Sequence, residues 1–221
     1  MDPNGATTTI IANPFDLGND ELERFALEEC IKRERAAQRA SVMVVPVGRG
    51  DLALKFANLG ADVLATDVAT RRQEVEDRIL AAGLKDKARF VPATINNLPD
   101  ELPGEPFDIV VVRHGLCSLR YEQARQVVRQ ILLKLRIGGK LYVSILGLHS
   151  ELGDGYPGRD LSIDQRYSAL APDIAKKYGI EGDVCLYSER NLFLLLLEAG
   201  CSVLRTMTTT YGNVKGVAVR V

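Results

Sequence analysis

Two glycines and one acid, placed at the ends of neighbouring apolar runs, carry the clearest chemistry in this sequence. Gly48 and Gly50 follow the run 42–47, and Asp67 closes the run 63–66. Glycines after a strand let a ligand approach the backbone closely, because no Cβ is in the way. A carboxylate at the end of the next strand can accept hydrogen bonds from both hydroxyls of a ribose. The spacing indicates a site for a nucleotide-like ligand, and the alternative is a structural βαβ unit with a tight turn.

Further polar residues follow the other expected strands, whose carboxyl ends converge at one edge of a parallel sheet. His114 is the first candidate for a general base and His149 the second, because imidazole titrates near neutrality. A hydrogen-bonding or surface histidine is the alternative for each. The cysteines lie far apart in the sequence, so no zinc or disulfide-exchange motif is predicted and no metal is expected; they are Cys30, Cys117, Cys185 and Cys201.

The residues above are positioned by strands that alternate with amphipathic stretches. Helices are expected over 51–59, from Thr70 (a capping-box pattern) to Gly83, and over 124–135, where apolar residues recur every three or four positions and Gly138-Gly139 end the run. Ser188 caps a helix that stops at Gly200. Strands are expected over the ranges 42–47, 63–66, 88–91, 109–112, 141–146, 201–207 and 214–221. The last two suit an antiparallel hairpin.

The chain divides into two parts and one insertion. Residues 1–40 read as a loose arm followed by a helix that Asn19 caps. Residues 41–221 read as one α/β domain, which suits the length of the chain. Residues 148–187 interrupt the alternation with glycines, prolines and tyrosines. We expect this insertion to be a substrate-facing lid, and the alternative is a surface excursion.

Composition limits the partners. The 28 basic and 29 acidic residues give a net charge of −1, so no general attraction to nucleic acid or anionic membrane is expected. No apolar run approaches the roughly 18 residues that cross a membrane, and the first residues lack a signal-peptide pattern. Unpaired cysteines suit the reducing cytoplasm, the expected location. A small-molecule substrate is expected; a protein or RNA acceptor stays open, DNA is not expected, and the oligomeric state is open.

The order of four motifs resembles the class I S-adenosylmethionine-dependent methyltransferases. The motifs are residues 42–50 with 61–67, Asn97-Leu98-Pro99, residues 107–111 and residues 135–141. The resemblance implies a Rossmann-like doubly wound α/β fold: a seven-stranded mixed sheet, mostly parallel, with a C-terminal antiparallel hairpin. It also implies S-adenosylmethionine as cofactor. The Val-Pro-Val-Gly-Arg-Gly segment looks more like the thiopurine and tellurite-resistance branches, whose substrates are small.

The resemblance also assigns roles to individual residues. Gly48 and Gly50, in a loop with Val47 and Arg49, would pass under the methionyl part and ribose of the cofactor. Asp67 would hold the ribose hydroxyls. The remaining implied positions are Val68 on the adenine, Thr94 and Ile95 at the adenine edge, and Arg113 and His114 beside the sulfonium and the acceptor.

Departures from the family pattern keep two other functions open. Val44 and Pro46 stand where the family usually has an acid and its first glycine, and Thr94 stands where it has an acid near the adenine. These changes favour an inactive methyltransferase-like binding or regulatory protein as the first alternative. The second is an NAD(P)-dependent oxidoreductase, because Gly48-x-Gly50-x-x-Ala53 fits that fingerprint. The terminal hairpin and the lack of room for a second catalytic domain argue against it.

Overall fold

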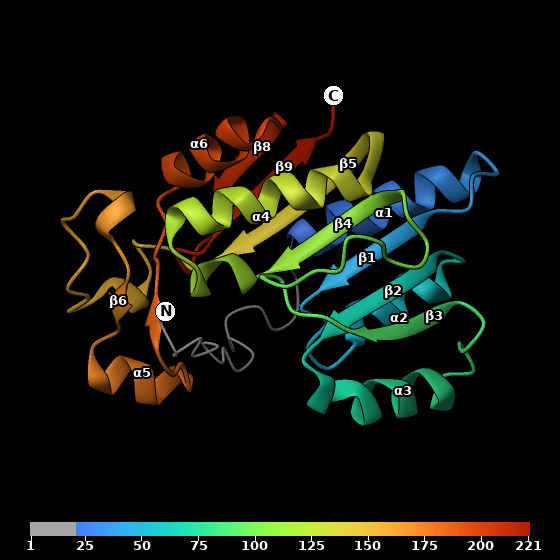
Figure 1. Ribbon diagram of the computed structural model, residues 1–221, viewed down its shortest axis with the longest axis horizontal. Helices are drawn as coiled ribbons and strands as arrows, with labels where there is room; N and C mark the ends of the chain where they lie inside the picture. Colours follow the sequence, from blue (N-terminus) through green and yellow to red (C-terminus); the bar gives the residue numbers. More distant parts are fainter. Residues whose placement is uncertain (1–20) are drawn as a thin grey trace.

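The computed structural model describes residues 21–221, which form one seven-stranded sheet with helices on both faces (Figure 1). The arm predicted for the first residues and the Asn19 cap lie outside this range. The helix expected after them is present as α1, Glu21–Arg35. None of the helices within the described range is long and apolar enough to cross a membrane.

The strand order is β3-β2-β1-β4-β5-β9-β8. The first five in this row pair in parallel, and β9 pairs antiparallel with both β5 and β8. The strands are β1 Ser41–Val45, β2 Asp62–Asp67, β3 Ala88–Pro92, β4 Phe107–Arg113, β5 Leu135–Ile145, β8 Ser202–Thr208 and β9 Val214–Val219. The predicted Rossmann-like mixed sheet with a C-terminal antiparallel hairpin is therefore confirmed.

Two hydrophobic layers hold the sheet between its helices. On one face α1, α2 (Asp51–Asn58) and α3 (Arg72–Ala81) pack over Val42, Val44 and Val63. On the other face α4 (Tyr121–Lys134) and α6 (Glu189–Ala199) pack over Met43, Val45 and neighbouring residues. Strands β1 and β4 are buried on both faces, which explains their continuous apolar sequences.

Two predicted boundaries are wrong for identifiable reasons. The helical run 124–135 ends at Lys134, and β5 already begins at Leu135 and runs through Gly138-Gly139. Thr70 does not cap α3, because a short 3-10 turn, Ala69–Arg71, precedes that helix. Both predicted ends of α6 are confirmed. The Ser188 hydroxyl accepts a hydrogen bond from the Asn191 N–H at the start of the helix, and Gly200 follows its end with a left-handed backbone conformation.

The insertion contains little regular structure. Its elements are the two-residue strands β6 (Ser168–Ala169) and β7 (Asp183–Val184), and helix α5 (Pro172–Tyr178). Strands β6 and β7 pair with each other, apart from the main sheet. The short helix expected between residues 164 and 178 is thus found at the end of that range.

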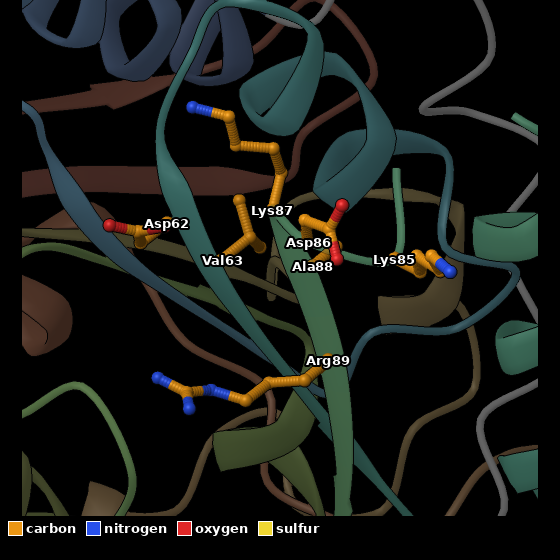
Figure 2. Close-up of a pocket in the computed structure, with 7 residues that line it drawn as sticks. All are labelled: Asp62, Val63, Lys85, Asp86, Lys87, Ala88 and Arg89. Atoms are coloured by element: carbon orange, nitrogen blue, oxygen red, sulfur yellow. The ribbon is translucent and has the colours of Figure 1, made fainter. Parts of the chain in front are cut away.

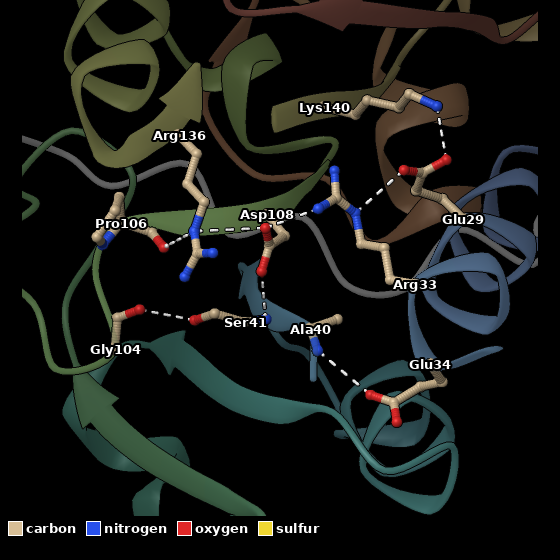
Figure 3. Close-up of polar contacts among 10 residues, drawn as sticks. All are labelled: Glu29, Arg33, Glu34, Ala40, Ser41, Gly104, Pro106, Asp108, Arg136 and Lys140. Carbon is tan, nitrogen blue, oxygen red and sulfur yellow. Dashed lines mark hydrogen bonds and ion pairs between the residues drawn. The ribbon is translucent and has the colours of Figure 1, made fainter. Parts of the chain in front are cut away.

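A buried carboxylate joins α1 to the amino end of the sheet (Figure 3). The Asp108 side chain is 2% exposed and lies 2.8 Å from Arg33 Nη1 and 3.4 Å from Arg136 Nε. Its second oxygen accepts from the Ser41 N–H at 2.9 Å. Arg33 also contacts Glu29, which in turn pairs with Lys140 of β5. This network fixes where α1 crosses the sheet and where β1 begins.

Replacing Asp108 by Ala should lower the free energy of unfolding by about 3 kcal/mol, because it leaves the Arg33 charge and the Ser41 N–H without their buried partner. Urea denaturation measures this loss. Asp62→Ala is the matched control, since Asp62 pairs with Arg39 while its side chain is 43% exposed; it should cost no more than about 1 kcal/mol. Equal losses in the two variants would contradict a structural role for the Asp108 network.

Candidate functional site

The loop between β1 and α2 has the backbone geometry that its glycines predict. Gly48 has φ +58° and Gly50 has φ +88°, a region that residues with a Cβ rarely adopt. A Cβ built on Gly48 would meet no atom of residues 21–221 within 4 Å, so among these residues the backbone there borders open space. The Val47 N–H donates to the Thr66 carbonyl at 2.8 Å and joins the loop to β2. The loop therefore presents accessible backbone at the carboxyl edge of the sheet.

Asp67 organises this edge. Its Oδ2 accepts from the Gly48 N–H at 2.9 Å, and its Oδ1 accepts from the Val68 N–H at 2.8 Å. A carboxylate offers about four acceptor positions, so each oxygen keeps capacity for a second donor. A direct hydrogen bond therefore joins the glycine loop to Asp67. The carboxylate is fixed in direction and retains acceptor sites for a ligand.

Three loops meet beside this carboxylate. A Cβ built on Gly115 would lie 3.0 Å from Ile95 Cδ1 and 3.1 Å from Pro46 Cδ. The loops after β1, β3 and β4 therefore pack together, and a side chain at position 115 would require the Ile95 and Pro46 side chains to shift. The crossing from β1 to β4 is where the strand order of the sheet reverses, which is where open α/β sheets bind ligands. Ile95 lies at this point, 7% exposed.

The remaining predicted cofactor residues occupy different environments at the same edge. Val47 is buried, and Val68 and Thr94 are partly buried. The Thr94 hydroxyl donates to Asn96 Oδ1 at 2.6 Å within its own turn. Arg49 is exposed, so water solvates its charge, and its carbonyl accepts from the Arg78 guanidinium.

The two candidate histidines differ in setting. His114 follows β4, is 8% exposed and adopts φ +56°, where residues with a side chain are uncommon. Its N–H donates to the Ser144 carbonyl at 2.8 Å, which holds it against β5. His149 is exposed, in a turn that packs on Gly212. Only His114 has the buried and conformationally constrained position of a functional residue.

Two residues that depart from the family pattern lie at the end of β1. Val44 lies inside this strand, pairs with Ala65 and Val111, and is fully buried against the helices of the α1 face. Pro46 follows the strand and is joined to Val45 by a cis peptide bond.

The cysteines are not nucleophiles in this structure. All four are buried and unbridged. Burial raises the pKa of the Cys30 and Cys201 thiols to about 11 and that of Cys185 to about 12. Burial also raises the pKa of Cys117, whose sulfur accepts from the Leu146 N–H. These thiols stay protonated at neutral pH, and chemistry at the site rests on other groups.

The insertion is fastened to the domain by buried polar side chains. Arg166, 8% exposed, donates to the carbonyls of Gly158, Leu161 and Leu186 and to Asn191 Oδ1. The Tyr167 hydroxyl donates to the Ser118 carbonyl, just after β4, at 3.0 Å. These bonds place the insertion next to the loop that carries His114. Its role as a lid stays a prediction.

A second polar pocket lies at the opposite edge of the sheet and is not favoured as the site. It is lined by Asp62, Val63, Lys85, Asp86, Lys87, Ala88 and Arg89. In Figure 2 the side chains of Lys85, Lys87 and Arg89 point away from one another, so they do not form a common anion site. Within residues 21–221, no group of three or more His, Cys, Asp or Glu is arranged to hold a metal ion.

Sequence reasoning missed two residues near the site. Ser144 and Lys215 are both buried at the carboxyl end of β5 and the start of β9. The available signal was a lysine inside the otherwise apolar run Val-Lys-Gly-Val-Ala-Val. Its neighbours across the sheet could not be read from that run.

Comparison with known proteins agrees with this geometry. Residues 42–139 match the family described as "Methyltransferase domain". A search of curated proteins by sequence finds no match. Among solved structures, a SAM-dependent methyltransferase from Methanosarcina mazei aligns with TM-score 0.64 and 19% identity, over 83% of this chain and 93% of that one.

Two other neighbours are longer proteins. The structure titled "PigF with SAH" aligns with TM-score 0.59 and 17% identity, over 90% of this chain and 56% of that one. The [4+2]-cyclase SpnF aligns with TM-score 0.60 and 19% identity, over 86% of this chain and 60% of that one. At these identities the likeness shows the fold alone. The resemblance seen in the sequence is thereby confirmed in the fold: the chain has the Rossmann-like fold of these methyltransferase structures, and its residues 42–139 are similar to the methyltransferase domain family.

Proposed function

We propose that this protein transfers a methyl group from S-adenosylmethionine to a small-molecule acceptor. The observation that carries the proposal is the Asp67 carboxylate, fixed by the Gly48 and Val68 N–H groups at the carboxyl edge of the sheet. It supplies an oriented acceptor for the two ribose hydroxyls. The open space over Gly48 fits the passage of a ligand along the loop. The bound cofactor would supply the electrophilic methyl group.

The other assigned residues shape the rest of this site. Val47, Arg49 and Gly50 belong to the loop under the methionyl part and ribose. Val68 would pack on the adenine, with Thr94 and Ile95 at its edge. Ile95 is already buried against Gly115 and Pro46, so it would form an apolar wall. Arg113, one residue before His114, would border the reacting centre.

Catalysis requires mainly alignment and exclusion of water, because methyl transfer is an in-line displacement. A base is needed only if the acceptor must lose a proton. His114 is the proposed base, since it is buried and held against β5, and the exposed His149 is the second candidate. The insertion 148–187, anchored beside this loop through Tyr167 and Ser118, would cover the acceptor.

The acceptor class rests on weaker support than the cofactor. The nearer likeness to the thiopurine and tellurite-resistance branches stays a prediction, and it favours small substrates. A net charge of −1 provides no attraction to RNA. The four unbridged cysteines suit a reducing compartment, so the cytoplasm is the proposed location. Detection of the protein in a secreted or periplasmic fraction would contradict that location.

A binding or regulatory protein without catalysis is the second candidate, because Val44, Pro46 and Thr94 depart from the family pattern. The cyclase among the structural neighbours shows that a similar fold carries another named reaction. Two observations argue against the oxidoreductase alternative: β9 is antiparallel to β5, and the family that matches residues 42–139 is a methyltransferase domain.

Calorimetric titration with S-adenosylhomocysteine tests the cofactor. The wild type should bind with micromolar affinity, about −8 kcal/mol. Asp67→Asn keeps an oxygen for the Gly48 N–H but loses the charge, and should weaken binding by at least about 1.5 kcal/mol. Asp62→Asn, at the other end of the same strand, is the matched control and should bind normally. Absence of heat with the wild type would refute the proposed cofactor.

A pair of glycine variants separates strain from binding. Gly48 and Gly83 have similar φ, +58° and +69°, and a Cβ on either would meet no atom within 4 Å in the described part of the chain. Ala at either position should cost about 1–2 kcal/mol of stability from the left-handed backbone. Only Gly48→Ala should weaken S-adenosylhomocysteine binding, by at least about fivefold, because its methyl group enters the ligand's space. Normal binding by a destabilised Gly48→Ala protein would place the ligand elsewhere.

His114→Asn tests the base, because Asn tolerates the left-handed backbone. On a phenol or thiol acceptor found by screening, turnover should fall at least about 100-fold, while S-adenosylhomocysteine affinity stays within twofold. His149→Asn should retain most activity. Wild-type turnover by His114→Asn would show that the acceptor needs no base from this residue.

A further inference from the structure

Three polar residues form a row across the carboxyl edge of the sheet. Arg113 of β4 is the register partner of Ser144 of β5, and Ser144 is the register partner of Lys215 of β9. Neighbouring strands are about 4.8 Å apart, and partners in register project to the same face. The residues two positions further into these strands are Val111, Tyr142 and Val217, which belong to the core on the α1 side. The row therefore lies on the α1 side of the sheet.

The row is unusually polar for its depth. Ser144 is 0% exposed and Lys215 is 2% exposed, while Arg113 is partly buried. Within residues 21–221, the Ser144 hydroxyl has no hydrogen-bond partner. The same holds, in that range, for Oδ1 of Asn213, 1% exposed and two positions before Lys215. Buried polar atoms are normally satisfied, so an orphaned hydroxyl between two cationic side chains indicates a ligand.

The row also lies next to His114, the proposed base. Arg113 immediately precedes His114, and Gly115 packs against Pro46 at the crossing from β1 to β4. The side chains of Lys85, Lys87 and Arg89 in Figure 2, in contrast, diverge from one another and lie at the far edge of the sheet.

We propose that Arg113, Ser144 and Lys215 bind an anionic group, a carboxylate or a phosphate, on the methyl acceptor. This rests on the proposed function for the meaning of the site. The planar Arg113 guanidinium can donate two hydrogen bonds to such a group, the Lys215 ammonium adds a compact charge, and the Ser144 hydroxyl donates one more bond. The acceptor would then be held by its anionic end, with its reactive atom toward His114.

Calorimetry on protein saturated with S-adenosylhomocysteine tests this assignment with benzoate, benzamide and inorganic phosphate. Benzoate and benzamide share a shape and differ in charge. At least one anion should bind, and benzoate or phosphate should bind at least about tenfold tighter than benzamide. Lys215→Met should reduce anion affinity at least about tenfold. Ser144→Ala, which removes an unbonded hydroxyl and preserves packing, should reduce it at least about threefold. Lys85→Met, an exposed cation at the opposite edge, should change nothing.

The outcomes are decisive. Equal affinity for benzoate and benzamide, no binding of either anion, or unchanged affinity in both Lys215→Met and Ser144→Ala would overturn the anion site. If Lys215→Met fails to fold, as judged by its thermal transition, the Ser144→Ala result decides. If S-adenosylhomocysteine does not bind, the proposed function fails, and the same anion titrations on the protein without it still decide this inference.

Discussion

Burial of the central parallel strands on both faces restricts where this protein can place polar chemistry. Strands β1 and β4 have almost no exposed side chains between their ends. Charged groups therefore gather at the two edges of the sheet. At the amino edge, Asp108 is enclosed by two arginines and a backbone N–H and serves the structure. At the carboxyl edge, the bonds that Asp67 makes within residues 21–221 come from backbone N–H groups, which bring no countercharge.

This difference in bonding is why we interpret Asp108 as a structural residue and Asp67 as a binding residue. The charge of a carboxylate that is paired with arginine is already neutralised within the folded protein. A carboxylate oriented by two amides retains both its charge and spare acceptor positions. The same bonds hold Gly48 in its left-handed conformation, so the shape of the loop and the direction of the acid are coupled. A ligand that bonds to Asp67 meets a site whose geometry is already set.

The sequence predicted the strands, the order of elements and the glycine turn after the first strand, because buried parallel strands and glycine turns leave strong local patterns. The hydrogen bond from Gly48 to Asp67 was seen only in the structure. It misplaced the end of α4. Residues 135–137 continue the amphipathic pattern, but Leu135 pairs with Phe107 in the sheet, and Gly138 takes φ +78° within β5. Tertiary pairing overrode the local preference there. The register that buries Val44 inside β1 is also set by tertiary pairing, with Ala65 and Val111 on the two neighbouring strands.

The row of Arg113, Ser144 and Lys215 could not have been read from the sequence, because its members come together only through the register of three strands. Lys215 enters the row by the antiparallel return of β9, a contact about 70 residues from Ser144. The fold positions the carboxyl edge of the sheet, but the solved proteins with a similar fold include a named cyclase as well as methyltransferases. The reaction must therefore be argued from the side chains at that edge. If Asp67 binds the ribose as proposed, then that acid, the constrained His114 and the basic row beside it are together what a methyltransferase of anionic acceptors would need. A protein that only binds the cofactor would have no use for the row.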